Sequence, residues 1–82
     1  MTTTFDFELR NGNHIAVLTI RADYYARDEG DRDAPDMSSY IDNGCVLAID
    51  GSVLVRGEGV TVFEVLNMAF PDALVEACEE QL

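Results

Sequence analysis

The sequence predicts an α+β domain in which an antiparallel sheet of about four strands, built from two hairpins, has two C-terminal helices packed on one face. The first supporting observation is that apolar and charged residues alternate over residues 5–10, as in a strand with one buried face. The second is that two dipeptides typical of tight turns, Asn11-Gly12 and Asp50-Gly51, lie between apolar runs. The third is that apolar residues recur at helical spacing from Thr61 onward. With 82 residues, the chain is expected to form a single domain, 1–82.

The first hairpin is predicted near the N-terminus. Residues 5–10 form its first strand, and the two phenylalanines in this segment lie on the buried face. Asn11-Gly12 would form a type I′ turn, because both central residues of that turn need positive φ. With these two residues as the loop, Phe7 is expected opposite Ala16.

The second hairpin is centred on Asp50-Gly51. Residues 45–49 form an apolar strand that leads into this turn, and residues 52–56 form the strand that returns. With this turn, Leu47 is expected opposite Leu54. Both strands carry apolar residues on both faces, which indicates central strands covered by helices on at least one side.

Two helices are predicted after the second hairpin. Residues 57–59, a Gly-Glu-Gly run, end the last strand, and Thr61 with Glu64 has the spacing of a capping box at a helix start. That helix ends before Pro71, which disfavours helical geometry at the preceding residue and is itself suited to the first position of the next helix. The apolar stripe of the last helix consists of Leu74, Ala77 and Cys78.

The connection between the hairpins, residues 26–44, has no clear periodicity. Five acidic residues lie within nine positions of it: Asp28, Glu29, Asp31, Asp33 and Asp36. A connection of this length without regular structure is usually functional or disordered. A calcium loop starting at Asp31 would need glycine at its sixth position, where this chain has Asp36. We therefore expect an acidic interaction loop and no metal site.

Residues that support enzyme chemistry are scarce. His14 is the only histidine, and the chain has no lysine and no glycine-rich phosphate loop. Cys45 and Cys78 lie in apolar contexts, where free thiols pack as small hydrophobes, and nothing in the sequence places His14 beside either. The chain also lacks a signal-peptide pattern at its start and an apolar run long enough to cross a membrane. We expect a non-enzymatic protein without cofactors, located in the cytoplasm, with both thiols reduced.

Sixteen acidic residues against five arginines give the chain a formal net charge of −11. This charge argues against direct binding to nucleic acid or to anionic lipids, both of which require basic patches. It suits a basic surface on another protein, above all a DNA-binding groove, where carboxylates compete with phosphates. The predicted partner-binding residues combine acids with two tyrosines that could serve as anchors. They are Asp23, Tyr24, Tyr25, Asp28, Glu29, Asp31, Asp33, Asp36, Asp42, Glu76, Glu79 and Glu80.

In its length, acidity, mixed α/β organisation and lack of enzyme motifs, the chain resembles the small phage-encoded anti-CRISPR inhibitors. The resemblance covers the whole chain in character and includes no shared motif, so it assigns no role to any residue. It implies an inhibitor that occupies the DNA-binding surface of a CRISPR–Cas complex in the host cytoplasm, by steric and electrostatic competition. We expect a monomer in preference to a homodimer.

Two alternatives stay open at the level of sequence. One is an acidic immunity or antitoxin protein that covers the active site of a nuclease, and it predicts a one-to-one complex with a single small enzyme. The other is a phage structural accessory module, and it predicts oligomerisation through an exposed sheet edge.

Overall fold

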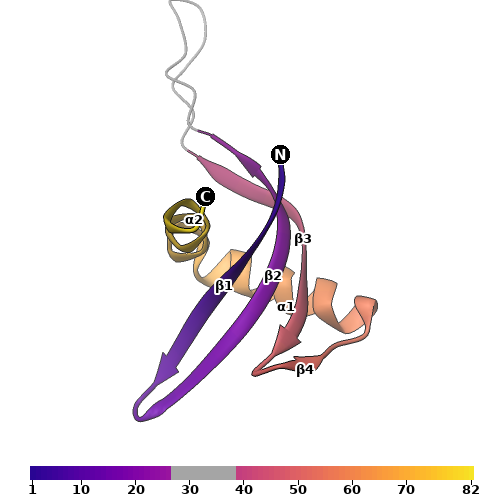
Figure 1. The fold of residues 1–82 in the computed structure, drawn as a ribbon, viewed down its shortest axis with the longest axis vertical. Helices are drawn as coiled ribbons and strands as arrows, with labels where there is room; N and C mark the ends of the chain where they lie inside the picture. Colours follow the sequence, from indigo (N-terminus) through magenta and orange to yellow (C-terminus); the bar gives the residue numbers. More distant parts are fainter. Residues whose placement is uncertain (27–38) are drawn as a thin grey trace, which may run out of the picture.

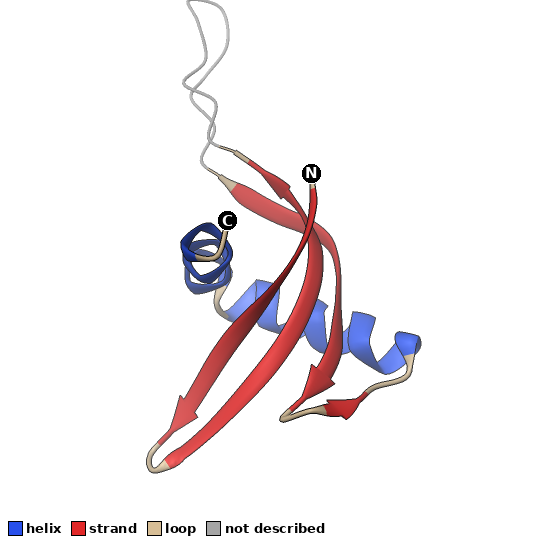
Figure 2. Cartoon of the chain, viewed as in Figure 1, coloured by secondary structure: helices blue, strands red, loops and turns tan. Residues whose placement is uncertain are grey.

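The computed structural model describes residues 1–26 and 39–82, which form a four-stranded antiparallel sheet with two helices on one face (Figures 1 and 2). The strands follow one another across the sheet in sequence order. The elements are β1 (Thr2–Asn11), β2 (His14–Tyr25), β3 (Tyr40–Ile49), β4 (Ser52–Val53), α1 (Arg56–Ala69) and α2 (Pro71–Glu80). The predicted α+β fold and its order of elements are confirmed.

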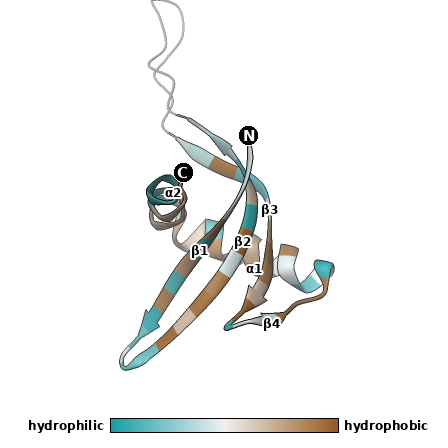
Figure 3. Ribbon diagram, viewed as in Figure 1, coloured by the Kyte–Doolittle hydropathy of each residue, from teal (hydrophilic) through white to brown (hydrophobic). Residues whose placement is uncertain are grey.

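One face of the sheet carries the hydrophobic core. Buried and exposed residues alternate along β1, and Figure 3 shows the matching alternation of apolar and polar residues. The helices cover this face, and the predicted stripe of α2 reaches the core, where Leu74 and Cys78 are fully buried. The core residues are Phe5, Phe7, Leu18, Ile20, Ala22, Tyr24, Ile41, Val46, Phe63, Leu66, Leu74 and Cys78.

The first hairpin turns at Gly12-Asn13, so the prediction of Asn11-Gly12 was wrong by one position. Gly12 has a φ of 61° and Asn13 is not in the positive-φ region, which is the pattern of a type II′ turn with glycine first. Phe7 therefore pairs with Leu18, two residues beyond the predicted partner Ala16. Because side chains alternate with a period of two, this shift leaves every side chain on its predicted face.

The second hairpin has the predicted register, with Ala48 opposite Val53. Its turn residues Asp50 and Gly51 have φ values of 51° and 84°, as a type I′ turn requires. The predicted length of the returning strand was wrong, because β4 ends at Val53 and the chain enters α1 at Arg56. Its predicted central position was also wrong, because β4 is an outer strand of the sheet and its Val53 is exposed.

β3 begins at Tyr40, well before the predicted start at Cys45, so the irregular connection is shorter at its C-terminal end than the predicted 26–44. Two register shifts, between Thr19 and Ile20 and between Arg21 and Asp23, place extra residues in β3 opposite β2. Such bulges interrupt the period-two pattern that identifies a strand in a sequence. The first half of β3 is therefore a strand because its backbone pairs with β2, although its sequence lacks the regular alternation of a strand.

α1 begins at Arg56, so the predicted capping box at Thr61 was wrong. The Thr61 hydroxyl instead donates to the Gly57 carbonyl one turn earlier, at 3.0 Å. Two glycines let this helix approach the sheet. A Cβ on Gly59 would collide with the Val46 carbonyl, and a Cβ on Gly44 would collide with the Phe63 ring. Gly44 belongs to β3, and for Gly59 in α1 this close packing outweighs the low helix propensity of glycine. As predicted, α1 ends at Ala69 and α2 begins at Pro71.

Candidate partner-binding surfaces

Four side chains at the paired ends of β2 and β3 form a surface cluster, Asp23, Tyr25, Tyr40 and Asp42, which we call the aspartate–tyrosine face. Asp23 lies opposite Asp42, and Tyr25 lies opposite Tyr40. Tyr24 and Ile41, which pair with each other between these two pairs, are buried in the core. Since neighbouring residues of a strand point to opposite faces, the four side chains project from the face that the helices leave uncovered.

The two tyrosines of this face stack on each other. Their ring centroids are 4.7 Å apart and the ring planes differ by 15°. The exposed fractions are 40% for Tyr25 and 42% for Tyr40, so more than a third of each side chain is available for contact. Stacked aromatic rings present an electron-rich surface that attracts ammonium and guanidinium groups.

The Asp23 carboxylate is held by two neutral donors. Thr2 Oγ1 donates to Asp23 Oδ1 at 2.6 Å, and Asn43 Nδ2 donates to Asp23 Oδ2 at 3.4 Å. The hydrogen bond from Thr2, with a smaller contribution from Asn43, lowers the pKa of Asp23 below its ordinary value. The carboxylate therefore stays ionised although Asp42 lies directly opposite.

Like charges directly opposite each other destabilise a sheet, and the Asp23–Asp42 pair has no compensating ion pair in the described part of the chain. The one ion pair found among residues 1–26 and 39–82 joins Arg10 to Glu8, at 3.3 Å. The Asp42 carboxylate accepts a 2.8 Å hydrogen bond from the Asn43 backbone nitrogen. The aspartates thus present two oriented anionic groups beside the stacked rings.

Tyr24, one of the two predicted anchors, belongs to the core, with an exposed fraction of 9%. Its hydroxyl donates to Glu79 Oε2 at 2.5 Å, and this bond fastens α2 to β2. Interaction with the Glu79 carboxylate raises the pKa of the Tyr24 phenol. Tyr24 and Glu79 therefore bind each other within the fold, and Tyr25 is the one of the two predicted anchors that lies at the surface.

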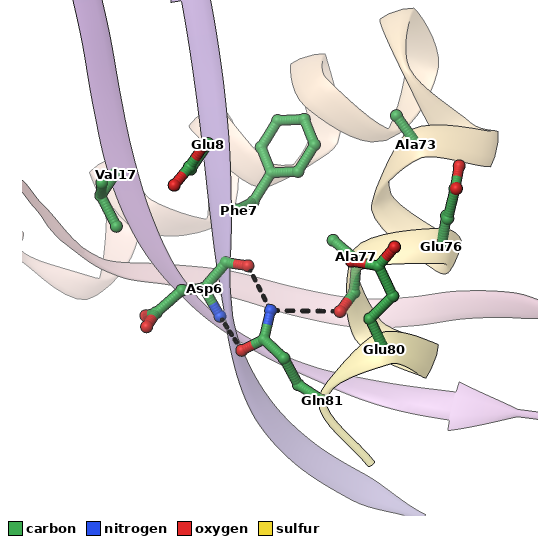
Figure 4. Close-up of a pocket in the computed structure, with 9 residues that line it drawn as sticks. All are labelled: Asp6, Phe7, Glu8, Val17, Ala73, Glu76, Ala77, Glu80 and Gln81. Carbon is green, nitrogen blue, oxygen red and sulfur yellow. Dashed lines mark hydrogen bonds between the residues drawn. The ribbon is translucent and has the colours of Figure 1, made fainter.

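A second acidic surface lies where α2 packs beside β1 (Figure 4). A groove of about 550 Å³ is lined there by Asp6 and Glu8 from β1 and by Glu76 and Glu80 from α2. We call these four residues and the space between them the acidic groove. None of the described residues that line it is basic.

Gln81 closes one side of the acidic groove. Its Nε2 donates to the Asp6 carbonyl at 2.6 Å and to the Ala77 carbonyl at 3.1 Å, while its Oε1 accepts from the Asp6 nitrogen at 2.8 Å. Figure 4 shows this carboxamide between the two elements, with the Asp6 carboxylate directed away from α2. Gln81 therefore fixes the end of α2 against the backbone of β1.

The structure distributes the predicted partner-binding residues over separate places. Asp23, Tyr25 and Asp42 come together in the aspartate–tyrosine face, and Glu76 and Glu80 line the acidic groove. The predicted loop acids lie outside the described residues. They are Asp28, Glu29, Asp31, Asp33 and Asp36.

Sequence reasoning missed Tyr40 in the aspartate–tyrosine face and Asp6 and Glu8 in the acidic groove. It also missed the residues that hold Asp23 and the end of α2 in place, which are Thr2, Asn43 and Gln81. The alternation along β1 does place its acids on a polar face. The sequence carries no signal that α2 packs at this edge of the sheet.

Of the groups with nucleophilic or basic chemistry, Cys78 and His14 lie apart from these surfaces, whereas the half-buried Cys45 lines hollows that it shares with Asp23 and Asp42. Cys78 is fully buried, and burial raises the pKa of its thiol. His14 is exposed and pairs with Asn11 at the hairpin turn. Across residues 1–26 and 39–82, no group of three His, Cys, Asp or Glu side chains is arranged to hold a metal ion. Over the same residues, no helix has the length and apolar character to cross a membrane.

Comparison with protein-family models, curated proteins and solved structures finds no match to this chain. The functional assignment therefore depends on the chemistry of the two surfaces.

Proposed function

We propose that this protein is a non-enzymatic inhibitor that binds a basic, nucleic-acid-binding surface of another protein, in the manner of the anti-CRISPR inhibitors that it resembles. The observation that carries the proposal is the aspartate–tyrosine face. Paired carboxylates and stacked rings at one surface are complementary to arginine and lysine side chains. The partner proposed is a CRISPR–Cas effector, whose DNA-binding channel supplies such side chains.

The paired aspartates favour association because their repulsion is relieved on binding. In the free protein Asp23 and Asp42 face each other, and neither forms an ion pair with a described residue, although the Met1 ammonium and Arg21 lie near enough to Asp23 to lower its pKa. A partner guanidinium placed between them would neutralise both and form charge-assisted hydrogen bonds. Tyr25 and Tyr40 would pack against the same group or its neighbour.

The charge of the whole chain supports rapid and selective encounter with a basic groove. Eleven of the sixteen acids lie in the described residues, against three of the five arginines. The electrostatic field of a strongly negative protein attracts a positively charged partner and speeds association, and this effect weakens as the salt concentration rises. Because duplex DNA also presents dense negative charge, protein and DNA would compete for the same groove.

Affinity capture from a host lysate at low and high salt, followed by identification of the captured protein, tests this function. The captured protein should bind labelled duplex DNA, and the inhibitor should displace that DNA. The variant Asp23→Asn with Asp42→Asn should weaken capture and displacement by at least about tenfold. The matched control is Glu58→Gln with Glu64→Gln on α1, which changes the net charge by the same amount. It should leave capture of the partner and displacement of DNA unchanged.

Two results would overturn the proposal: a captured protein that does not bind nucleic acid, or equal loss of binding in both double variants. A captured ribonucleoprotein supports the CRISPR–Cas assignment. A single small nuclease in a one-to-one complex supports the immunity-protein alternative instead.

A further inference from the structure

β1 is an outer strand of the sheet, so one of its edges has no neighbouring strand among residues 1–26 and 39–82. Met1 and Tyr24 exchange two backbone hydrogen bonds, with N···O distances of 3.2 Å from Met1 to Tyr24 and 2.7 Å from Tyr24 to Met1. In an antiparallel pair, such hydrogen-bonded residue pairs alternate with non-hydrogen-bonded ones. The odd-numbered residues of β1 therefore bond to β2. The even-numbered residues direct their N–H and C=O groups to the free edge.

One even-numbered residue, Asp6, already has a partner at this edge. The Gln81 carboxamide accepts from the Asp6 nitrogen and donates to the Asp6 carbonyl (Figure 4). A neighbouring strand makes the same pair of bonds to a residue of this orientation. Gln81 thus takes the place of one residue of an added strand, and the edge has the geometry that strand pairing needs.

Glu8 and Arg10, the next even-numbered residues, have no backbone partner on this edge among the described residues. Unpaired backbone groups of this kind form a template for an extended segment of another chain. Their side chains are also exposed, so the edge is not covered there.

Charge determines which segment fits. The acidic groove lies beside this edge, with Glu76 and Glu80 on α2. Glu8 on β1 is paired with Arg10 at 3.3 Å, and the Asp6 carboxylate is directed away from α2, so Glu76 and Glu80 are the acids that would meet a cation placed in the groove. A second copy of the chain, itself with net charge −11, would bring the same acids together and be repelled. A segment with lysine or arginine at alternate positions would place cations in the groove while its backbone pairs with β1.

We propose that the free edge of β1, from Asp6 to Arg10, binds an extended lysine- or arginine-rich segment of a partner protein as an added strand, which displaces Gln81 from Asp6. This surface is separate from the aspartate–tyrosine face, and the proposal does not depend on the function proposed above.

The test uses the full chain and a synthetic peptide in which lysine alternates with valine and threonine. Amide hydrogen exchange is followed residue by residue by NMR. Peptide binding should slow exchange of the Glu8 and Arg10 amide hydrogens at least about tenfold, because each N–H gains an acceptor. The same peptide with N-methylated backbone amides keeps its charges but loses its donors, and it should bind at least about tenfold more weakly. Gln81→Ala should strengthen binding of the unmodified peptide, because the competing carboxamide is gone.

Three outcomes of the peptide experiments would overturn the proposal. They are no binding of the peptide, equal binding of the N-methylated peptide, and binding without added protection at Glu8 and Arg10. Protection that appears without peptide and grows with protein concentration would also overturn it, in favour of a second copy on the edge. Peptide binding should persist in the variant Asp23→Asn with Asp42→Asn. The two proposals therefore fail independently.

Discussion

The hydroxyl of Tyr24 donates a 2.5 Å hydrogen bond to the carboxylate of Glu79, which joins a central strand of the sheet to the last helix. Other direct links hold α2 in place, among them the Gln81 carboxamide on β1 and the burial of Leu74 and Cys78. The Tyr24–Glu79 bond therefore belongs to the packing of the fold, and it makes α2 sensitive to alkaline pH.

Tyr24→Phe should lower the thermal midpoint at neutral pH by a few degrees, because Glu79 loses its donor. The pKa of Tyr24 is raised in the folded state, so its contribution to stability is complete below the ordinary value of 10.0 and is lost as pH rises through the raised value. Thermal unfolding from pH 7 to pH 12 should thus show a steeper alkaline loss in the wild type than in Tyr24→Phe. Tyr40→Phe is the control and should behave like the wild type. Parallel curves for wild type and Tyr24→Phe would contradict this.

Thr2→Val should raise the pKa of Asp23 toward 3.8, because the main hydrogen bond that lowers it is removed. A group with a lowered pKa stabilises the fold above its unfolded pKa, and the effect is lost as pH falls through the folded pKa. The wild type should therefore be more stable than Thr2→Val at pH 7, and the difference should vanish in strong acid. NMR titration of Asp23 measures the pKa. Thr4→Val on the same strand is the control, and an unchanged Asp23 pKa in Thr2→Val would refute the assignment.

Gly44→Ala and Gly59→Ala should each destabilise the protein by about 2 kcal/mol, because a methyl group at either position collides with the helix–sheet interface. Gly57→Ala is the matched substitution, since nothing lies within 4 Å of its Cβ position. Within a helix it should stabilise by about 0.5 kcal/mol. Urea unfolding gives all three values. Equal effects at Gly57 and Gly59 would show that α1 does not approach β3 this closely.

Gly12→Ala should destabilise the protein by about 1 kcal/mol, because Gly12 has a φ of 61° that alanine adopts only with strain. Asn11→Ala should have a much smaller effect, since Asn11 is the last residue of β1 and lies outside the turn. Urea unfolding of both variants decides which two residues form the turn. A large effect at Asn11 would restore the turn predicted from sequence.

Tyr25→Leu with Tyr40→Leu should weaken binding of the captured partner by roughly tenfold while leaving the thermal midpoint nearly unchanged. Leucine keeps an apolar side chain but removes the aromatic surface offered to cations. Met68→Ala, which removes an 85% exposed apolar residue from α1, is the control. Binding that survives loss of both rings would restrict the interface to carboxylates.

Much of this fold follows from local signals in the chain. The alternation in β1, the Asp50-Gly51 turn and the start of α2 at Pro71 each depend on neighbouring residues alone, and each was predicted. The predictions failed where contacts with residues distant in the sequence determine the secondary structure. Gly59 is helical because it contacts β3, and residues 40–44 are a strand because they pair with β2 across two bulges. The turn at Gly12-Asn13 required a choice between two registers that place the same side chains on the same faces.

The sequence alone determined the acidity of the chain, the number of main strands and helices, and the buried face of the first hairpin, because composition and periodicity are local properties. Only the tertiary structure decided which acids stand together. Asp23 meets Asp42, and Tyr25 meets Tyr40, because of the β2–β3 register, while Glu76 and Glu80 share a groove with Asp6 because α2 packs at the edge of β1. Tyr24 and Tyr25 show the same division: adjacent in sequence, they point to opposite faces of the sheet, one into the core and one to the surface.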